Sequence, residues 1–185
     1  MPGYYSAVGA PTLSRKPLSP TRQCRAFAEH MLPIPTKFFV TSGKAVSKVS
    51  DLNAFDEALQ NAGLAEQNIV SVSSVLPVGI RPVRRRDLPM GAITHCVLAQ
   101  QRGGEGETIS AGIAYGFRDD DFGGYVAEGH MHGTKNSLRE VMEWKMGEMA
   151  KLRGIKFRRI DYRIEDLSIP MDHYGACLAA LVFLV

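Results

Sequence analysis

Residues 68–77 read NIVSVSSVLP, a run of strand-forming side chains that holds two adjacent serines. Isoleucine, valine and leucine favour strands, and Pro77 ends the run. Side chains on a strand alternate between its two faces, so Ser73 and Ser74 are predicted to point to opposite faces. Adjacent serines near the end of a strand are commonly turn formers or hydroxyls at a sheet edge. By themselves they therefore assign no function.

The sequence on either side of this strand predicts a helix and further strands. Upstream, residues 36–43 are predicted as a strand and residues 52–63 as a helix, with Ser50 or Asp51 as its cap and Gly63 as its stop. Downstream, further strands are predicted at residues 91–100, 108–117, 125–133, 157–169 and 176–185.

A second, longer helix is predicted over residues 135–154, after the capping residue Thr134. Its mostly apolar stripe consists of Leu138, Val141, Trp144, Lys145, Met149 and Leu152. The resulting order, β-α-β-β-β-β-α-β-β with hairpin-like connections, predicts an α+β fold. Its expected architecture is a layered αββα-type sandwich with mainly antiparallel sheets.

Composition predicts one globular domain behind a basic arm. The 185 residues are 45% hydrophobic and 22% charged, which is ordinary for a soluble globular protein. Residues 1–35 hold six prolines and no sustained period, so they are predicted to be an N-terminal arm, and residues 36–185 a single domain. Residues 1–50 carry a net charge of +6 and the remaining chain −3. A slightly acidic body suits a cationic small molecule better than nucleic acid.

Targeting signals and cysteine usage predict a cytoplasmic protein without a membrane partner. No apolar run approaches the length of a membrane span, and the start lacks the charged-then-apolar pattern of a signal peptide. Cys24, Cys96 and Cys177 lie far apart without CxxC spacing. This count argues against a disulfide framework and fits a reducing compartment.

Asp56 is a candidate functional carboxylate in the first predicted helix. It shares a helix face with Leu52 and Leu59, four residues before it and three after it. A charge on an apolar face is costly unless it is paired or lies at the edge of a site. The alternative is a boundary position in water.

A second cluster of candidates lies in YVAEGHMHG, residues 125–133. Glu128 ends the apolar part of this strand, where partial burial would raise the pKa of a carboxylate and suit a general acid. It could equally be an exposed residue at a strand end. His130 and His132 have the spacing of metal ligands, but the next acid, Glu140, lies inside the second helix. We therefore predict no metal site.

Five segments, taken in their order and spacing, resemble the pyruvoyl-dependent arginine decarboxylases: LNAFDEALQNAG, NIVSVSSVLP, LPMGA, GETISAGIA and GGYVAEG. The resemblance covers about residues 36–185 and includes YGACLAALVF near the C-terminus. Members of this family cut their own chain between two serines. The resemblance therefore implies cleavage between Ser73 and Ser74, with Ser74 becoming a covalent pyruvoyl cofactor. The basic arm lies outside the resemblance and has no assigned role.

The resemblance also implies an activity: decarboxylation of L-arginine to agmatine and carbon dioxide, a step of polyamine biosynthesis. The reaction would run through an imine between the substrate amine and the pyruvoyl group. By match to the family, Glu128 is the proton donor to Cα. Asp56 is the carboxylate expected to hold the guanidinium, since a planar acid fits a fork-shaped cation.

The remaining site residues are also implied by the match. Leu52 and Phe55 would line the aliphatic stem of the substrate, and Asn68 would support cleavage or substrate binding. Family sites form between neighbouring subunits, so a homotrimer or a dimer of trimers is implied.

Three alternatives stay open on the sequence. The chain could be a pyruvoyl enzyme for another amino acid, such as histidine or aspartate; the charge of Asp56 does not separate arginine from lysine or ornithine. It could be a subunit that keeps the fold without processing, although Ser73 and Ser74 are intact. It could also be a metal-binding protein built on His130 and His132.

Overall fold

The computed structural model describes residues 33–185, so almost all of the predicted arm, with Cys24, lies outside the described residues. Residues Ile34–Val185 form one compact unit. Its helices are α2 (Asp51–Ala62) and α3 (Lys135–Arg153). Its strands are β1 (Lys37–Ser47), β2 (Asn68–Ser71), β3 (Val75–Leu76), β4 (Arg81–Pro82), β5 (Ile93–Gly103), β6 (Thr108–Arg118), β7 (Gly124–His132), β8 (Phe157–Ser168) and β9 (Tyr174–Leu184).

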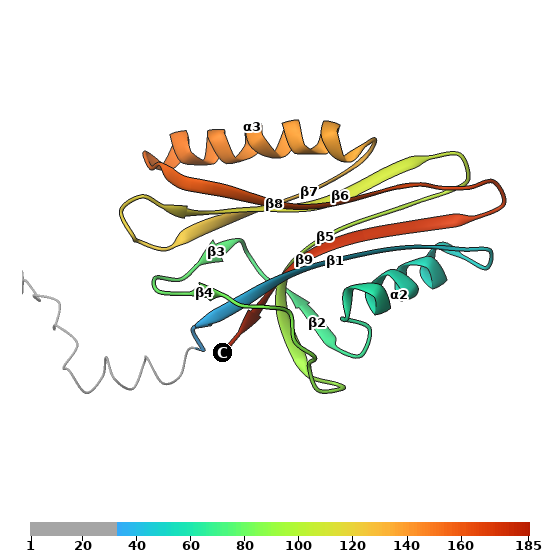
Figure 1. The fold of residues 1–185 in the computed structure, drawn as a ribbon, viewed down its shortest axis with the longest axis horizontal. Helices are drawn as coiled ribbons and strands as arrows, with labels where there is room; N and C mark the ends of the chain where they lie inside the picture. The colour runs from blue at the N-terminus through green and yellow to red at the C-terminus, as the bar shows by residue number, and fades with distance from the viewer. Residues whose placement is uncertain (1–32) are drawn as a thin grey trace, which may run out of the picture. The chain divides into compact units, whose positions relative to one another are not determined.

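These elements form four layers: α2, a five-stranded sheet, a four-stranded sheet and α3 (Figure 1). The strand orders are β2-β5-β9-β1-β4 and β3-β7-β6-β8. The long strands pair antiparallel, and short β2 and β4 add parallel pairs to β5 and β1. The predicted α+β sandwich with mainly antiparallel sheets is thus confirmed. Between the sheets lies an apolar core that includes Phe38, Leu76, Val97, Ile113 and Leu181.

Helix α2 begins and ends where the sequence predicts. The Ser50 hydroxyl accepts the Asn53 amide at 3.2 Å, and Gly63 ends the helix with φ 71°. The predicted apolar face is wrong in part, since Leu52 is 63% exposed. Small side chains instead allow α2 to approach β1, where a side chain at Gly43 would collide with the helix backbone. The buried face consists of Ala54, Ala58 and Ala62.

Helix α3 also has its predicted cap, with the Thr134 hydroxyl accepting the Ser137 amide at 3.4 Å. Its predicted stripe is wrong at Val141, Trp144, Lys145 and Leu152, which are exposed. The sheet has glycines at positions 112 and 129 beneath the helix. Side chains from a different face of α3 than the predicted stripe fill the space that these glycines leave. The buried residues are Leu138, Met142 and Met146. In the described part of the chain, neither helix is long and apolar enough to span a membrane.

The serine-containing stretch is two strands rather than the single strand predicted for residues 68–77. β2 ends at Ser71 and belongs to the five-stranded sheet, whereas β3 belongs to the four-stranded sheet (Figure 1). Val72 packs against the core between the sheets, which gives the chain a reason to turn inward there. The segment 72–74 therefore carries the chain from one sheet to the other, and we term it the crossover.

Because β2, β3 and β4 are short, β1, β5 and β7 are edge strands along most of their length. β3 pairs with β7 only at Gly124 and Tyr125, and β4 pairs with β1 only at Lys37 and Phe38. The sandwich therefore has two open edges, each with one strand from each sheet. We term the edge formed by β5 and β7 the serine edge, because the crossover lies there. The opposite edge, formed by β1 and β8, is the ion-pair edge.

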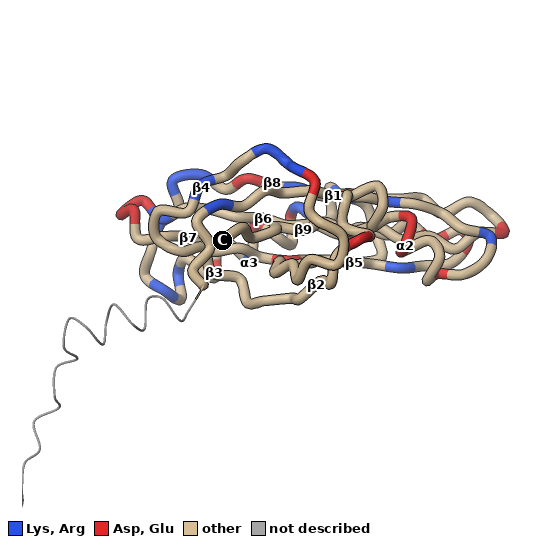
Figure 2. The backbone as a smooth tube through the Cα atoms, turned by 90° about the horizontal axis from the view of Figure 1, so that it is seen from below, with Lys and Arg blue, Asp and Glu red and all other residues tan. Residues whose placement is uncertain are grey.

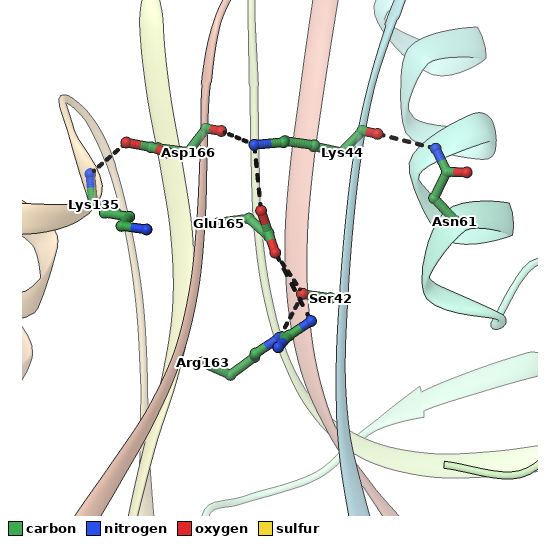
Figure 3. Close-up of polar contacts among 7 residues, drawn as sticks. All are labelled: Ser42, Lys44, Asn61, Lys135, Arg163, Glu165 and Asp166. Carbon is green, nitrogen blue, oxygen red and sulfur yellow. Dashed lines mark hydrogen bonds and ion pairs between the residues drawn. The ribbon is translucent and has the colours of Figure 1, made fainter.

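A polar network joins the two sheets at the ion-pair edge (Figure 3). The Ser42 hydroxyl donates to Glu165 Oε1 at 2.8 Å and accepts from Arg163 Nε at 2.7 Å. Lys44 Nζ lies 3.5 Å from Glu165 Oε2 and donates to the Asp166 carbonyl at 2.9 Å. The network reaches the two helices through the side chain of Asn61 and the amide of Lys135.

The loop between β4 and β5 carries three consecutive arginines at positions 84–86, and Figure 2 shows how charge is distributed along the chain. All three arginines are exposed. Arg85 Nη1 donates to the Asn61 carbonyl at 3.3 Å, in the last turn of α2. Positive charge is favourable at this end of a helix. The loop thus contributes a helix-end contact.

Candidate active site

The peptide bond between Ser73 and Ser74 lies in the crossover and is held by hydrogen bonds on both sides. The Ser73 carbonyl accepts the Val75 amide at 3.1 Å, which makes a three-residue turn centred on Ser74. The Ser74 carbonyl accepts the Val126 amide at 3.0 Å, where pairing with β7 begins. Neither serine has a positive φ. Hydrogen bonds therefore position this peptide bond without strain from a left-handed backbone.

This arrangement suits attack by Ser74 on the carbonyl that precedes it. The Val75 N–H points at the carbonyl oxygen of Ser73. A donor at that position stabilises the negative charge that develops on the oxygen when a nucleophile adds to the carbon. No feature of the sequence indicated this contact, because the donor is a backbone amide.

Glu128 supplies an acceptor for the nucleophile. The Ser74 hydroxyl donates to Glu128 Oε2 at 2.9 Å, although the two residues lie 54 positions apart in the chain. The structure thus brings together two residues that the sequence singled out separately. Of the two positions that the sequence left open for Glu128, the exposed one is observed in the single chain. Beyond Tyr125, β7 pairs with β6 on one side, and its other side has no neighbouring strand in the described residues.

His130 and His132 lie on the same side of β7 as Glu128, and both contact a residue that the sequence analysis missed. His130 Nδ1 lies 2.8 Å from Gln101 Oε1, and His132 Nε2 lies 3.0 Å from Gln101 Nε2. His132 Nδ1 lies 3.3 Å from Glu107 Oε1. Within residues 33–185, no three potential metal-ligating side chains gather in one place. Sequence spacing gave no sign that Gln101 of β5 lies beside β7.

Asn68 lies at the start of β2 and holds the loop that leads into β5. Its side-chain Nδ2 donates to the Gly91 carbonyl at 2.8 Å, and its amide donates to the Ala92 carbonyl at 2.9 Å. In the described part of the chain, no hydrogen bond joins Asn68 to the serine pair or to Glu128. Its contacts therefore position β2, which leads directly into the crossover.

Asp56 and Leu52 are exposed on the outer surface of α2. Asp56 Oδ2 accepts Gln60 Nε2 at 3.1 Å, within the same helix. Of the two interpretations of Asp56, the position in water is observed in the single chain, because the alanine face of α2 is the one that packs. α2 covers the outer face of the five-stranded sheet, whereas the crossover runs between the sheets (Figure 1). A single chain thus leaves Asp56 and Ser74 on different faces of one sheet.

Phe55 is half-buried, and its ring already binds a cation. The Arg102 guanidinium carbon lies 4.4 Å from the ring centroid, and Arg102 Nη1 lies 3.3 Å from Asp51 Oδ2. Stacking on an aromatic face and pairing with a carboxylate are the two contacts that a guanidinium favours. This surface of α2 therefore accommodates a guanidinium from the chain itself.

Lys145 contacts the strand that carries Glu128. Its Nζ donates to the main-chain carbonyl of Glu128 at 3.1 Å. The sequence placed Lys145 in an apolar stripe, but the methionine face of α3 packs on the sheet instead, which leaves Lys145 to reach the edge of β7. A positive charge is thus held close to Glu128.

The described cysteines are poor nucleophiles. Burial raises the pKa of the Cys96 thiol to about 11. Burial and, to a smaller extent, Glu165 and Asp166 raise the pKa of Cys177 to about 12. Both thiols are free and remain protonated near neutral pH.

Comparison with known proteins extends over the whole sandwich. Residues 37–185 match the family described as pyruvoyl-dependent arginine decarboxylase (PvlArgDC). A protein of that name from Methanothermobacter thermautotrophicus is 32% identical over 152 residues, 82% of this chain and 98% of the relative. Pyruvoyl-dependent arginine decarboxylase 2 from Archaeoglobus fulgidus is 35% identical over 164 residues, 84% of this chain and all of the relative. The matched segment contains every described strand and helix, and the chain belongs to the pyruvoyl-dependent arginine decarboxylase family.

Proposed function

We propose that this protein decarboxylates L-arginine to agmatine and carbon dioxide with a pyruvoyl group made from Ser74. Family membership supports the reaction. The observation that carries the proposal for this chain is the crossover, where the Ser74 hydroxyl is hydrogen-bonded to Glu128 at 2.9 Å. The relatives' names identify arginine as the substrate, in preference to histidine or aspartate.

The residues present fit the formation of a pyruvoyl group. This chemistry needs a free serine Oγ, a preceding carbonyl within its reach, a donor on that carbonyl and a hydrogen-bond acceptor that orients the hydroxyl. Ser74 supplies the first, Ser73 the second, the Val75 amide the third and Glu128 the fourth. Each requirement is therefore met by a named atom.

Self-cleavage then follows from these contacts. The Glu128 carboxylate orients the Ser74 hydroxyl, whose Oγ attacks the Ser73 carbonyl carbon and gives up its proton to the Ser74 nitrogen. The C–N bond between the serines breaks, and the Ser74 nitrogen, with that proton, becomes an amine, so that an ester replaces the amide. Loss of the Ser74 α-proton expels the Ser73 carboxylate. The resulting dehydroalanine tautomerises, and water hydrolyses it with release of ammonia, which leaves the pyruvoyl group at the start of the second chain.

During turnover the residues of the chain orient the substrate and move a proton. The pyruvoyl group, once formed, accepts the electron pair released as carbon dioxide leaves. Glu128, adjacent to position 74, donates a proton to the substrate Cα and regains one from solvent. Lys145 holds the main chain at Glu128. Asn68 positions β2, and its contribution is to cleavage rather than to direct substrate contact.

The guanidinium end of the substrate is held by α2 of a neighbouring subunit. Asp56 binds it bidentately, and Leu52 and Phe55 line the aliphatic stem. Two observations support a site shared between subunits: the exposure of Leu52, 63%, and the position of α2 on the far face of the sheet from the crossover. We therefore infer a homotrimer of cleaved protomers, or a dimer of such trimers.

The cellular role that we propose is polyamine biosynthesis in the cytoplasm. Agmatine is a polyamine precursor. Free, buried thiols at Cys96 and Cys177 are compatible with a reducing compartment.

An intact-mass spectrum of the purified protein, followed by an amino-acid decarboxylation assay, tests this proposal. We expect two chains separated at Ser73–Ser74, the second with a keto group that blocks N-terminal sequencing. Arginine should be the preferred substrate over lysine, ornithine, histidine and aspartate. A fully active preparation made of one uncut chain contradicts the proposal.

A further inference from the structure

Gln101 joins the two sheets at the serine edge. From β5, its Oε1 lies 2.8 Å from His130 Nδ1 and its Nε2 lies 3.0 Å from His132 Nε2, both on β7. The second N–H of the amide points to the Arg102 carbonyl at 3.0 Å. No other side-chain hydrogen bond between β5 and β7 occurs in residues 33–185. We term this contact the glutamine bridge.

The donors and acceptors of the bridge are mutually consistent. An amide oxygen only accepts, so His130 donates from Nδ1. An amide nitrogen only donates, so His132 accepts at Nε2 and carries its proton on Nδ1, toward Glu107 at 3.3 Å. One glutamine amide thereby specifies the proton position on two histidines.

A second link between β5 and β7 at this edge is the crossover itself. Its first half is attached to β5, where the Val72 amide donates to the Cys96 carbonyl at 3.0 Å. Its second half is attached to β7, where the Val126 amide donates to the Ser74 carbonyl at 3.0 Å. A cut between Ser73 and Ser74 separates these two halves. The crossover then no longer connects β5 to β7 at this edge, whereas the glutamine bridge remains.

We propose that Gln101 is a positioning residue. It holds β7, and with it the Glu128 carboxylate, in place against β5 of the other sheet after the chain has been cut. This inference rests on the proposed self-cleavage. Glu128 lies two residues before His130 on the same side of the strand, so the bridge restrains the segment that carries the proton donor. Gln101 itself does not touch the reacting atoms.

The test is the Gln101→Leu variant in two backgrounds, the naturally processed protein and the uncut Ser74→Ala protein. Hydrogen exchange is measured at Ala127, Gly129 and Met131. Their amides face β6, because they alternate with Val126, whose amide faces the crossover. In the processed protein we expect exchange to rise by about five- to tenfold, the loss of roughly one net hydrogen bond. In the uncut protein the crossover still restrains β7, so the rise should be much smaller.

Three further measurements separate positioning from a general loss of stability. The turnover number of processed Gln101→Leu should fall by about five- to tenfold with little change in KM. Gln101→Glu keeps the length and an acceptor for His130, so it should recover most of the turnover. Histidine nitrogen resonances of the wild type should report both protons on Nδ1. Gln100→Leu, the same change at the exposed neighbouring position, should behave like the wild type.

The outcomes distinguish this inference from the proposed function. Equal exchange in the two backgrounds, or unchanged turnover in processed Gln101→Leu, overturns the inference and leaves the decarboxylase assignment intact. An uncut wild-type protein overturns the proposed self-cleavage, and the role of Gln101 with it. If Gln101→Leu does not fold, Gln101→Met supplies the same comparison, since it keeps the length of the side chain and removes the amide that contacts both histidines.

Discussion

The two edges of the sandwich are closed by different chemistry. At the ion-pair edge, Ser42 and Lys44 of β1 meet Arg163, Glu165 and Asp166 of β8 through charged hydrogen bonds (Figure 3). At the serine edge, the neutral amide of Gln101 and the crossover join β5 to β7. Hydrogen bonds to charged groups contribute about 1.5–3 kcal/mol each, roughly twice as much as neutral ones. The stronger contacts therefore lie at the edge that the proposed chemistry leaves alone.

This difference fits what each edge has to do. Under the proposed function, the serine edge presents a peptide bond to attack, is cut there and then admits a substrate. The ion-pair edge has no such demand, because its strands are long and continuous. The contrast teaches that the candidate site occupies the edge at which neutral contacts and the crossover, rather than ion pairs, join the two sheets.

The largest expected effect comes from Ser74→Ala, which keeps the serine edge covalently closed. Without Oγ there is no nucleophile, so the chain should remain uncut and decarboxylation should be undetectable. Denaturing gels and intact mass measure the cut, and carbon dioxide release measures activity. Ser73→Ala is the matched control, since only the carbonyl of Ser73 is attacked, and it should still be cut. Cleavage of the Ser74→Ala protein would move the reacting hydroxyl elsewhere.

Glu128→Gln should separate formation of the pyruvoyl group from turnover of the substrate. Glutamine keeps an oxygen that accepts from the Ser74 hydroxyl at the 2.9 Å contact, so two chains should still form. It cannot donate a proton as an acid does, and turnover should fall by about 10²–10⁴. Arginine should still be trapped on the second chain by borohydride.

His130→Asn is the control for that experiment. Asparagine presents a donor near the position of His130 Nδ1 and should preserve the contact with Gln101, so turnover should change much less than in Glu128→Gln. Near-normal turnover in Glu128→Gln together with collapse in His130→Asn would assign the proton donor to the histidine.

Asp56→Asn tests whether α2, on the outer face of the five-stranded sheet, completes the site at the serine edge of a neighbouring subunit. Loss of a charged hydrogen-bonding partner typically costs about 1.5–3 kcal/mol, so handling of arginine should weaken ten- to over a hundredfold. Cleavage should be unaffected, because the Asp56 side chain accepts a hydrogen bond from Gln60 and, within residues 33–185, has none to the serine pair. Glu57→Gln, one residue away and also exposed, is the control. Wild-type kinetics in Asp56→Asn would make it a surface residue of α2.

The smallest effect on catalysis is expected at the ion-pair edge. Ser42→Ala removes a buried hydroxyl that bonds both Glu165 and Arg163, and should lower the free energy of unfolding by about 1–3 kcal/mol. Urea denaturation measures this loss. Cleavage and turnover should be unchanged, and Ser71→Ala at an exposed position should leave stability near the wild type. Impaired cleavage in Ser42→Ala would show that the two edges are coupled.

Local features of this protein were predictable from its sequence. The caps Ser50 and Thr134 and the stop at Gly63 were correct, because capping depends on residues within one turn of the helix end. The alternation of strands and helices predicted the layered α+β fold. The serine pair and the segments around it carried the family resemblance, which the match over residues 37–185 confirms.

Contacts between distant segments were decided only by the tertiary structure. Periodicity did not reveal which flank of α3 fits the glycines beneath it, so the stripe was placed on the wrong side. The split of residues 68–77 between two sheets depends on which strands they pair with, and pairing is not encoded locally. The bond from Ser74 to Glu128 and the bridge from Gln101 to His130 join positions far apart in the chain. Such contacts exist only once both sheets have formed, because the packing of one sheet on the other sets the distance between their edges.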